Sequence, residues 1–428
     1  MIRNGKKKAI SCALVAAMSV GLAACGTTSY DFKVSYDGIK TGDVSSKVSV
    51  HDPSILKADG EYYIFGSHMS AAKSSDLLNW EKVADGYSKK NPVYGQIYDV
   101  ADEAFAYSGS KNSLIKTDDK QVHVWAPDVI YNETTGLYYM YYCTTSTWNA
   151  SNLCYGTSTT PEGPYEWQGA LIYSGFNRKT ISGTDVLDYV DEDYAYKNYI
   201  KGAQYNYEDY PNAIDPTVFY DADGRMWMVY GSWSGGIFLL EIDKTTGLVI
   251  HPEADKANNV DPYYGKRLLG GGHISIEGPY IMYDETSGYY YLFVSYGALT
   301  SNGGYQVRVF RSKTVDGEYV DMNGKYPEKS AQHQNFGLKL TGNYKLPSLE
   351  KAYMATGHNS AFVDDDGRMY LVYHTRFNDN GEGHSPRVHQ MLVNEDGWPC
   401  ELPYQTQGET VNKDGYDTDD IIGRYYVI

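Results

Sequence analysis

The sequence predicts an all-β protein built from five copies of one structural unit, and three observations lead to this prediction. Tyrosine, which favours strands, supplies 44 of the 428 residues, and glycine, which favours turns, supplies 43. Few stretches have the long hydrophobic period of an amphipathic helix. One pattern recurs five times: a polar residue, an alternating strand, a turn that ends in glycine, and a strand rich in aromatic residues.

Five hairpins follow one another along the chain. The copies span residues 51–66, 125–142, 214–230, 276–293 and 357–373, and three of them turn at Asp-Gly, a strong hairpin signal. The polar residues that mark the copies are 76, 87, 62 and 81 residues apart: Asp52, Asp128, Asp215, Glu277 and His358. Each interval holds about four strands with their loops, which is one propeller blade. We therefore predict a five-bladed β-propeller over residues 47–415. A β-sandwich does not explain five hairpins that each begin with a polar residue.

Three acidic residues begin inner strands of this predicted propeller. The first strand of each blade lines the central axis, so the residues that begin these strands converge at one mouth of the channel. Asp52, Asp215 and Glu277 occupy such positions. Carboxyl groups that face a common cavity supply the acid and the base of glycoside hydrolysis. A single Asp-Pro is usually a turn residue, but three acids in register favour a catalytic site. Asp128 lies two residues further into its strand, and we predict a structural role for it.

Composition and missing motifs argue against other functions. The formal net charge of −17 opposes binding to nucleic acid or to an anionic membrane surface. The sequence has no GxxxxGK[ST], HExxH or CxxC motif, which speaks against a phosphate loop, a zinc-protease helix and a zinc ribbon. Gly270–Gly272 is interpreted as a flexible rim. Cys143 and Cys154 could form a disulfide, which the sequence leaves open.

The first residues are predicted to be a targeting segment. Basic residues precede an apolar run, Ala9–Ala24, that is too short to span a membrane. Residues 22–26, Leu-Ala-Ala-Cys-Gly, resemble the lipobox of bacterial lipoproteins, in which Cys25 carries lipid; an ordinary cleaved signal is the alternative. We therefore expect a signal peptide over 1–24 and a tether over 25–46. The protein would be extracytoplasmic, and the lipid on Cys25 would be its only contact with a bacterial membrane.

Five short motifs together resemble the signatures of glycoside hydrolase family 43. They are HDPS at 51–54, WAPD at 125–128, NAIDP at 212–216, IEGP at 276–279 and GHNS at 357–360. Each motif is weak alone, but their order and spacing extend the resemblance from Val48 to Thr410. It implies a five-bladed propeller that hydrolyses arabinose- or xylose-containing polymers with inversion. It also implies Asp52 as general base, Glu277 as general acid, and Asp215 as the residue that orients the acid and tunes its pKa.

These roles have physical requirements of their own. The base must be ionised near neutral pH, and we expect Asp52 to achieve this through access to solvent. The acid must be protonated, so Glu277 needs a pKa raised by burial or by a nearby carboxylate such as Asp215.

Further residues are assigned to metal and sugar binding. In arabinanase-like members of the family, the histidine that matches His358 meets a calcium ion in the channel, mostly through water. The resemblance therefore implies Ca²⁺ near His358, although nitrogen is an unusual calcium ligand. Trp125 and Trp233 are candidate platforms for sugar rings, with core packing as the alternative, and Asn212 is assigned to substrate binding with them.

The segments 373–377, 387–391 and 396–399 look most like the larger endo-acting α-1,5-arabinanases. We therefore expect a monomeric enzyme that cleaves arabinan or arabinose-containing oligosaccharides. Such enzymes carry a further β-domain, which could begin at 416–428. An exo-acting arabinofuranosidase or β-xylosidase is one alternative, and a non-catalytic sugar-binding propeller is another. The insert at 174–210, rich in Tyr and Asp, is expected to form a rim loop that decides between endo and exo action.

Overall fold

The computed structural model describes residues 41, 45–100, 105–108, 123–145, 150–327, 329, 333–379, 381–410, 415–417, 419 and 422. Lys40–Thr410 form one compact unit, which contains every described strand. The predictions of a signal peptide and of lipidation at Cys25 concern residues outside this set. The same is true of most of the tether at 25–46 and of the segment 416–428.

Five of the six antiparallel sheets in the described part of the chain are blades of the propeller, and we number them I to V. Blade I contains β1 (Ser54–Ala58), β2 (Glu61–Gly66), β3 (Ser70–Ser74) and β4 (Glu81–Ala84). Blade II contains β5 (His123–Asn132), β6 (Leu137–Thr145), β7 (Ser151–Ser158) and β8 (Glu166–Ser174). Blade III contains β11 (Thr217–Tyr220), β12 (Met226–Tyr230), β13 (Ile237–Ile242), β14 (Val249–Ile250), β15 (Val260–Asp261) and β16 (Gly265–Leu269).

Blade IV contains β17 (Ile276–Asp284), β18 (Tyr289–Tyr296), β19 (Gln306–Ser312) and β20 (Leu338–Lys339). Blade V contains β21 (Tyr353–Val363), β22 (Met369–Phe377), β23 (Ser385–Val393) and β24 (Pro399–Glu401). A separate hairpin is formed by β9 (Ile200–Lys201) and β10 (Gln204–Tyr205). The described helices are short: α2 (Gly95–Asp99), α4 (Val186–Tyr189), α5 (Glu192–Asn198), and the 3₁₀ turns η1 (Ser67–Met69), η3 (Ile181–Gly183), η4 (Lys256–Asn258) and η5 (His333–Asn335).

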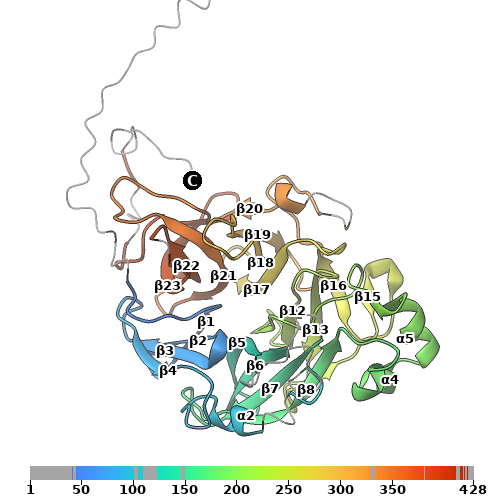
Figure 1. Cartoon of the computed structure of the whole chain (residues 1–428). Helices are drawn as coiled ribbons and strands as arrows, with labels where there is room; N and C mark the ends of the chain where they lie inside the picture. Colours follow the sequence, from blue (N-terminus) through green and yellow to red (C-terminus); the bar gives the residue numbers. More distant parts are fainter. Residues whose placement is uncertain are drawn as a thin grey trace, which may run out of the picture. The chain divides into compact units, whose positions relative to one another are not determined.

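The inner strands of the five blades close a ring. In order, β1 contacts β5, β5 contacts β11, β11 contacts β17, β17 contacts β21, and β21 contacts β1 (Figure 1). Each inner strand pairs with the next strand of its blade, as the five predicted hairpins require. At the first hairpin, Asp59 and Gly60 have φ of 52° and 80°, which is the geometry of a two-residue hairpin turn. The predicted five-bladed β-propeller is confirmed.

The beginnings of the inner strands share an unusual backbone conformation. The backbone angle φ is positive at Asp52 (55°), Ala126 (40°), Asp215 (55°), Gly278 (57°) and His358 (49°). A proline follows the first four of these residues. The strand pairing shifts register at this point in β5, β17 and β21, and such bulges change the direction of a side chain. The chain therefore turns sharply at the same position of every blade.

Asp128 is not one of these five residues, because the equivalent position of blade II is Ala126. The side chain of Asp128 is 2% exposed and contacts residues of two other blades. It accepts hydrogen bonds from the Ser54 hydroxyl of blade I and, at 2.6 Å, from the backbone N–H of Val218 in blade III. Burial raises the pKa of Asp128 to about 7, and these hydrogen bonds oppose the rise. The contacts are those of a structural residue.

The insert at 174–210 forms η3, α4, α5 and the β9–β10 hairpin, where the sequence predicted a rim loop. Asp191 caps α5 by accepting a hydrogen bond of 2.7 Å from the N–H of Tyr194. Apolar residues of the insert, such as Phe176 and Tyr199, share one hydrophobic cluster with Tyr230 of β12 and other residues of blade III. The insert is therefore packed onto blade III by its apolar side chains.

The two cysteines of blade II are free. In the β6–β7 register, Cys143 lies opposite Leu153 and Cys154 lies opposite Tyr142. Neighbouring residues of a strand point to opposite faces of the sheet, and the two thiols belong to different core clusters. The disulfide that the sequence left open is therefore not formed.

Side chains close the seam between blade I and blade V. Ser360 Oγ accepts a hydrogen bond from the N–H of Ile55 at 3.1 Å and donates one to the carbonyl of Pro53 at 2.8 Å. Lys57 of β1 forms an ion pair with Asp364. Each described blade comes from one continuous segment, so no described strand is exchanged across the seam.

We predict that Ser360→Ala destabilises the propeller by about 1–3 kcal/mol, because it leaves a buried N–H and a buried carbonyl without their partner. Urea unfolding followed by tryptophan fluorescence measures the free energy of unfolding. Ser182→Ala, at an exposed serine, is the control and should change it by less than about 0.5 kcal/mol. Equal stability of the two variants would contradict a role for Ser360 in closing the ring.

Candidate active site

A cavity of about 690 Å³ lies where the five inner strands begin, and all five blades contribute to its wall. The residues predicted for the site line it together: Asp52, Trp125, Asn212, Asp215, Trp233, Glu277 and His358. Asp128 is not among its lining residues. No residue of the 174–210 insert is among the lining residues that the structure describes. The positive-φ turns explain why these side chains meet in one cavity. Each positive-φ residue either lines the cavity or is next in sequence to a residue that lines it.

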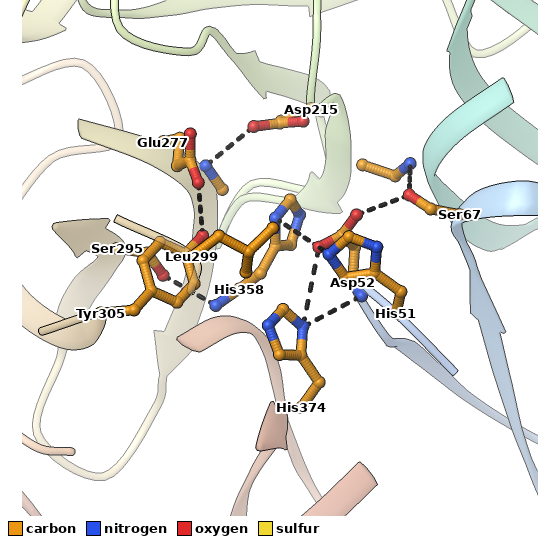
Figure 2. A network of polar contacts seen from close by, with 12 residues as sticks. His51, Asp52, Ser67, Asp215, Glu277, Ser295, Leu299, Tyr305, His358 and His374 are labelled. Atoms are coloured by element: carbon orange, nitrogen blue, oxygen red, sulfur yellow. Dashed lines mark hydrogen bonds and ion pairs between the residues drawn. The ribbon is translucent and has the colours of Figure 1, made fainter. Parts of the chain in front are cut away.

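Asp52 is at the centre of a polar network (Figure 2). Its Oδ1 lies 3.1 Å from His51 Nε2, 3.1 Å from His358 Nδ1 and 3.7 Å from His374 Nδ1. Its Oδ2 accepts a hydrogen bond of 2.5 Å from the Ser67 hydroxyl. The backbone N–H of Asp52 donates to His374 Nδ1 at 3.2 Å. Both oxygens and the amide of Asp52 therefore have protein partners.

The charge on Asp52 is stabilised from within the protein. Burial would raise its pKa, but His358, His51 and the Ser67 hydroxyl outweigh burial and lower the pKa of Asp52 to about 2. The residue is only 8% exposed, so access to solvent, which the sequence suggested as the reason for ionisation, is not the main cause. In the opposite direction, burial lowers the pKa of His358, but the carboxylates of Asp52, Asp215 and Glu277 raise it above its usual value.

Glu277 is half-buried in the cavity wall, and both of its carboxyl oxygens accept hydrogen bonds. Tyr305 donates to Oε1 at 2.7 Å, and the indole N–H of Trp233 donates to Oε2 at 2.8 Å. Removal from bulk water raises the pKa of Glu277, and the negative charge of Asp52 adds to the rise, while Tyr305, His358 and Trp233 oppose it. A carboxyl group with a raised pKa can hold a proton and donate it.

Asp215 lies beside Glu277 on the neighbouring blade. Its Oδ2 accepts a hydrogen bond of 3.1 Å from the N–H of Gly278, the residue after Glu277. Burial raises the pKa of Asp215 to about 7; the charges of Glu277 and Asp52 add to the rise and that of His358 opposes it. Repulsion between two carboxylates acts on both, so a charge on Asp215 also disfavours ionisation of Glu277.

Gly278 shows why the backbone is tight at this point. Its φ of 57° suits glycine, and a Cβ atom there would lie 3.0 Å from the ring of His358. The backbone N–H of His358 is held in turn by Ser295 Oγ at 2.8 Å. The imidazole of His358 therefore packs directly against the turn that carries the acid.

A group of three imidazoles lies next to Asp52. One ring nitrogen from each of His51, His374 and His384 lies within 4.8 Å of the other two. The rings of His51 and His384 are stacked at 3.8 Å, and burial lowers the pKa of His51 to about 4. Ca²⁺ usually takes six to eight oxygen ligands, and Asp52 is the carboxylate in contact with these rings. A calcium ion held here by Asp52 and an imidazole would therefore have to take its remaining ligands from water.

The predicted sugar-binding residues differ in their surroundings. Trp233 is 36% exposed and binds Glu277 through its indole N–H, which a sugar platform does not require. Trp125 is half-buried, and its Nε1 has no hydrogen-bond partner among the described residues. Asn212 is buried and accepts a hydrogen bond of 3.0 Å from the Ser174 hydroxyl.

Several contacts of the site were missed by the sequence analysis. Ser67 links two blades, since its hydroxyl donates to Asp52 and accepts from the N–H of Ala126 at 2.8 Å. Tyr305 lies outside every repeated motif, among 44 tyrosines, so nothing in the sequence marks it. His374 follows the aromatic strand of the fifth hairpin. The segment 373–377, which contains it, resembles arabinanases, but nothing in that segment indicates a contact with Asp52.

Comparison with known proteins identifies the family. The model of glycosyl hydrolases family 43 matches residues 44–210 and 191–399, which together cover most of the chain. This chain belongs to glycosyl hydrolases family 43. As a family-43 chain it is similar to an extracellular endo-α-(1→5)-L-arabinanase of Thermotoga petrophila, 39% identical over 392 residues, 89% of this chain and 75% of that protein. It is also similar to the extracellular endo-α-(1→5)-L-arabinanase 2 of Bacillus subtilis, 37% identical, covering 90% of this chain and 76% of the relative.

Solved structures agree with the family. The crystal structure of endo-1,5-α-L-arabinanase from Thermotoga petrophila in complex with TRIS superposes with a TM-score of 0.74 at 38% identity, covering 90% of this chain and 79% of that one. An extracellular exo-α-(1→5)-L-arabinofuranosidase of Cellvibrio japonicus is more distant, at 27% identity over 83% of this chain and 87% of its own length. Within the described part of the family-43 chain, no helix is both long enough and apolar enough to cross a membrane.

Proposed function

We propose that this chain is an inverting, endo-acting glycoside hydrolase of α-1,5-linked arabinan. The observation that carries the proposal is the convergence in one cavity of three carboxyl groups whose surroundings separate their pKa values. Groups held in opposite protonation states are what acid and base catalysis require.

In the proposed mechanism, Asp52 is the general base. Its carboxylate stays ionised because two imidazoles and a hydroxyl stabilise the charge. It takes a proton from a water molecule as that water attacks the anomeric carbon of the arabinose unit. Glu277 gives its proton to the glycosidic oxygen as the bond to the leaving sugar breaks. Direct attack by water inverts the configuration, and it requires carboxyl groups roughly 6.5–9.5 Å apart.

Asp215 is proposed to keep Glu277 protonated before the reaction. In its ionised form it raises the pKa of the acid, and its hydrogen bond with the N–H of Gly278 holds the turn that carries the acid. His358 balances the negative charge of this group through its ion pair with Asp52.

The choice of substrate and of endo action rests on the relatives and on the cavity. The two relatives with 37–39% identity are named endo-arabinanases, and the relative named as exo-acting is 27% identical. The insert that we expected to control access packs on blade III, and none of its residues is among the described lining of the cavity. Trp125, Trp233 and Asn212 are proposed to contact the sugars of the arabinan chain.

We place the enzyme outside the cytoplasm, since both relatives are named extracellular. The likeness of residues 22–26 to a lipobox supports a lipid anchor on Cys25. Mass spectrometry of the protein isolated from membranes would detect the lipid.

We also propose that a calcium ion binds at the propeller axis. Asp52, His358 and the neighbouring imidazoles would hold it, largely through water. When bound, it would supply positive charge that favours the ionised state of nearby carboxylates.

Glu277→Gln and Asp52→Asn should each lower kcat on debranched arabinan by a factor on the order of 10²–10⁴, the usual contribution of a positioned acid or base. The release of oligosaccharides, followed over time, measures the rate and separates endo from exo action. The exposed turn residues Glu285→Gln and Asp59→Asn are matched controls and should keep full activity. If Glu277→Gln or Asp52→Asn retained more than about a tenth of the wild-type rate, the role assigned to that residue would be rejected. If the wild-type protein bound arabinan tightly and released no product, the alternative of a non-catalytic sugar-binding propeller would be favoured.

Asp215→Asn should move the basic limb of the pH–rate profile to lower pH. The basic limb reports deprotonation of the general acid, and removal of a neighbouring negative charge lowers the pKa of Glu277. Profiles of kcat/KM from pH 4 to 9 test this, with the exposed Asp223→Asn as the control. A basic limb that stays in place in Asp215→Asn would show that Asp215 does not tune the acid.

If calcium binds the axis, a chelator should lower both activity and the melting temperature, and added Ca²⁺ should restore both, because an ion that binds only the folded state stabilises it. His358→Ala should mimic the chelated protein, and the two treatments should not add. Metal analysis of dialysed protein gives a readout that does not depend on activity. The calcium proposal would be rejected if dialysed protein contained no metal and a chelator changed neither its melting temperature nor its activity. The carboxylate mechanism would then be unchanged.

A further inference from the structure

The loop between β12 and β13, residues Gly231–Gly236, is attached to both neighbours of the acid pair. We call it the Trp233 loop. The N–H of Gly231 donates to the carbonyl of Ile214 at 2.9 Å, and the N–H of Trp233 donates to the carbonyl of Ile276 at 2.7 Å. Ile214 directly precedes Asp215, and Ile276 directly precedes Glu277. The loop therefore spans the gap between the two carboxyl-bearing turns.

The loop packs closely against its neighbours at two glycines. A Cβ atom on Gly235 would lie 2.4 Å from the backbone of Tyr210, and one on Gly236 would lie 2.1 Å from the carbonyl oxygen of Leu269. Trp233 itself has a φ of 55°. A backbone packed this closely fixes the direction in which the Trp233 side chain leaves the loop.

The Trp233 indole and the Tyr305 phenol bind different oxygens of the same carboxyl group. Trp233 Nε1 donates to Glu277 Oε2 at 2.8 Å, and Tyr305 Oη donates to Glu277 Oε1 at 2.7 Å. Indole N–H can only donate, so the direction of that bond is fixed. The Ser232 hydroxyl is a weaker neighbour of Oε2, at 3.4 Å. Two donors on two oxygens define the plane of the carboxyl group, which one donor alone does not.

Tyr305 is held as firmly as the Trp233 loop. Its side chain is fully buried, and its ring lies 6.0 Å from the ring of His374 in a stacked arrangement. A Cβ atom on Gly357 would lie 2.4 Å from the Tyr305 ring, so glycine at this position leaves the space that the ring occupies. The phenol therefore reaches Glu277 from a fixed direction on the far side of the carboxyl group.

We propose that Trp233 and Tyr305 are the positioning residues of the general acid, each holding one oxygen of Glu277 so that its proton faces the glycosidic oxygen. This inference rests on the proposed function, because it gives a role to two side chains that act through the acid. It separates two roles for Trp233: the edge of its ring orients Glu277, while the exposed part of the ring remains available to a sugar.

Conservative variants isolate the two hydrogen bonds. Trp233→Phe and Tyr305→Phe each keep an aromatic ring and remove the donor. Three other groups interact with Glu277 through their charge, and both variants leave them unchanged: His358, Asp52 and Asp215. We expect kcat on debranched arabinan to fall about tenfold in each, because a misplaced reacting group loses rate. KM should change by less than about twofold in Tyr305→Phe, whose ring is buried, and it should rise in Trp233→Phe, because Trp233 is also proposed to contact the sugar.

The basic limb of the pH–rate profile should move to higher pH by about one unit in each variant. Donors to a carboxylate favour its charged form, so removal of a donor raises the pKa of Glu277. This shift is opposite in direction to that expected for Asp215→Asn. A merely structural role for the two residues would lower the melting temperature and leave the limb where it is.

Two further variants serve as matched controls. Trp125→Phe removes an indole N–H from the same cavity, and Tyr296→Phe removes a buried hydroxyl from blade IV; neither donor has a hydrogen-bond partner among the residues described. Neither should move the basic limb, whatever Trp125→Phe does to KM. Melting curves and circular dichroism verify folding, and if Trp233→Phe does not fold, Tyr305→Phe tests the proposal alone.

The outcomes distinguish a failure of the positioning role from a failure of the proposed hydrolase function. If Glu277→Gln retained activity, Glu277 would not be the general acid, and the positioning role of Trp233 and Tyr305 would be rejected as well. An inactive Glu277→Gln, together with unshifted basic limbs in folded Trp233→Phe and Tyr305→Phe, would overturn the positioning role and leave the function standing. A shift in one variant only would confine the role to that residue.

Discussion

The three carboxyl groups of the site and His358 depend on the positive-φ turn at the start of an inner strand. The same backbone conformation occurs in all five blades, at Asp52, Ala126, Asp215, Gly278 and His358. Such a conformation is unfavourable for residues other than glycine, and it persists only where the surroundings enforce it. The closed ring enforces it here, because each inner strand is wedged between two others. The turn then directs side chains into the axial cavity instead of onto a sheet face.

The cavity shields three carboxyl groups from bulk water to different degrees, and their neighbours differ. Asp52 has imidazoles and a hydroxyl, Glu277 has two neutral donors, and Asp215 has a backbone N–H and another carboxyl group. Burial alone would protonate all three. The imidazole of His358 reverses this for Asp52, to which it is paired at 3.1 Å. The ion pair with His358, together with His51 and the Ser67 hydroxyl, thus sets the protonation state of Asp52 apart from those of the other two carboxyl groups.

The sequence was sufficient for the fold and for the membership of the site. Repeated hairpins gave the number of blades, and the spacing of polar residues placed Asp52, Asp215, Glu277 and His358 in one cavity. It was insufficient for the contacts that tune them. Ser67, Tyr305 and His374 reach the carboxyl groups from other segments, and a hydrogen bond between residues far apart in sequence leaves no local pattern. Asp128 is instructive, because its motif resembles the others although the turn of blade II is at Ala126.

The 174–210 insert illustrates a second limit. This segment, rich in tyrosine and aspartate, was predicted to form a rim loop, yet residues such as Tyr199 and Tyr205 are buried against blade III. The Tyr199 hydroxyl donates to the buried carboxylate of Asp261 at 2.8 Å, so a polar tip does not keep the residue at the surface. Composition alone does not distinguish a tyrosine in a loop from one in a core.

The seam between blades I and V has a consequence for how the chain reaches its final form. The hydrogen bond between Ile55 and Ser360 joins residues 305 positions apart, and loop-closure entropy makes such contacts late to form. Since each blade is complete in itself, four junctions between neighbouring blades can assemble in sequence before the fifth does. The last junction to form is then the one between the first and the last blade in chain order. A circularly permuted chain, with its new ends in a loop between blades that does not line the cavity, would form the same ring and the same axial cavity.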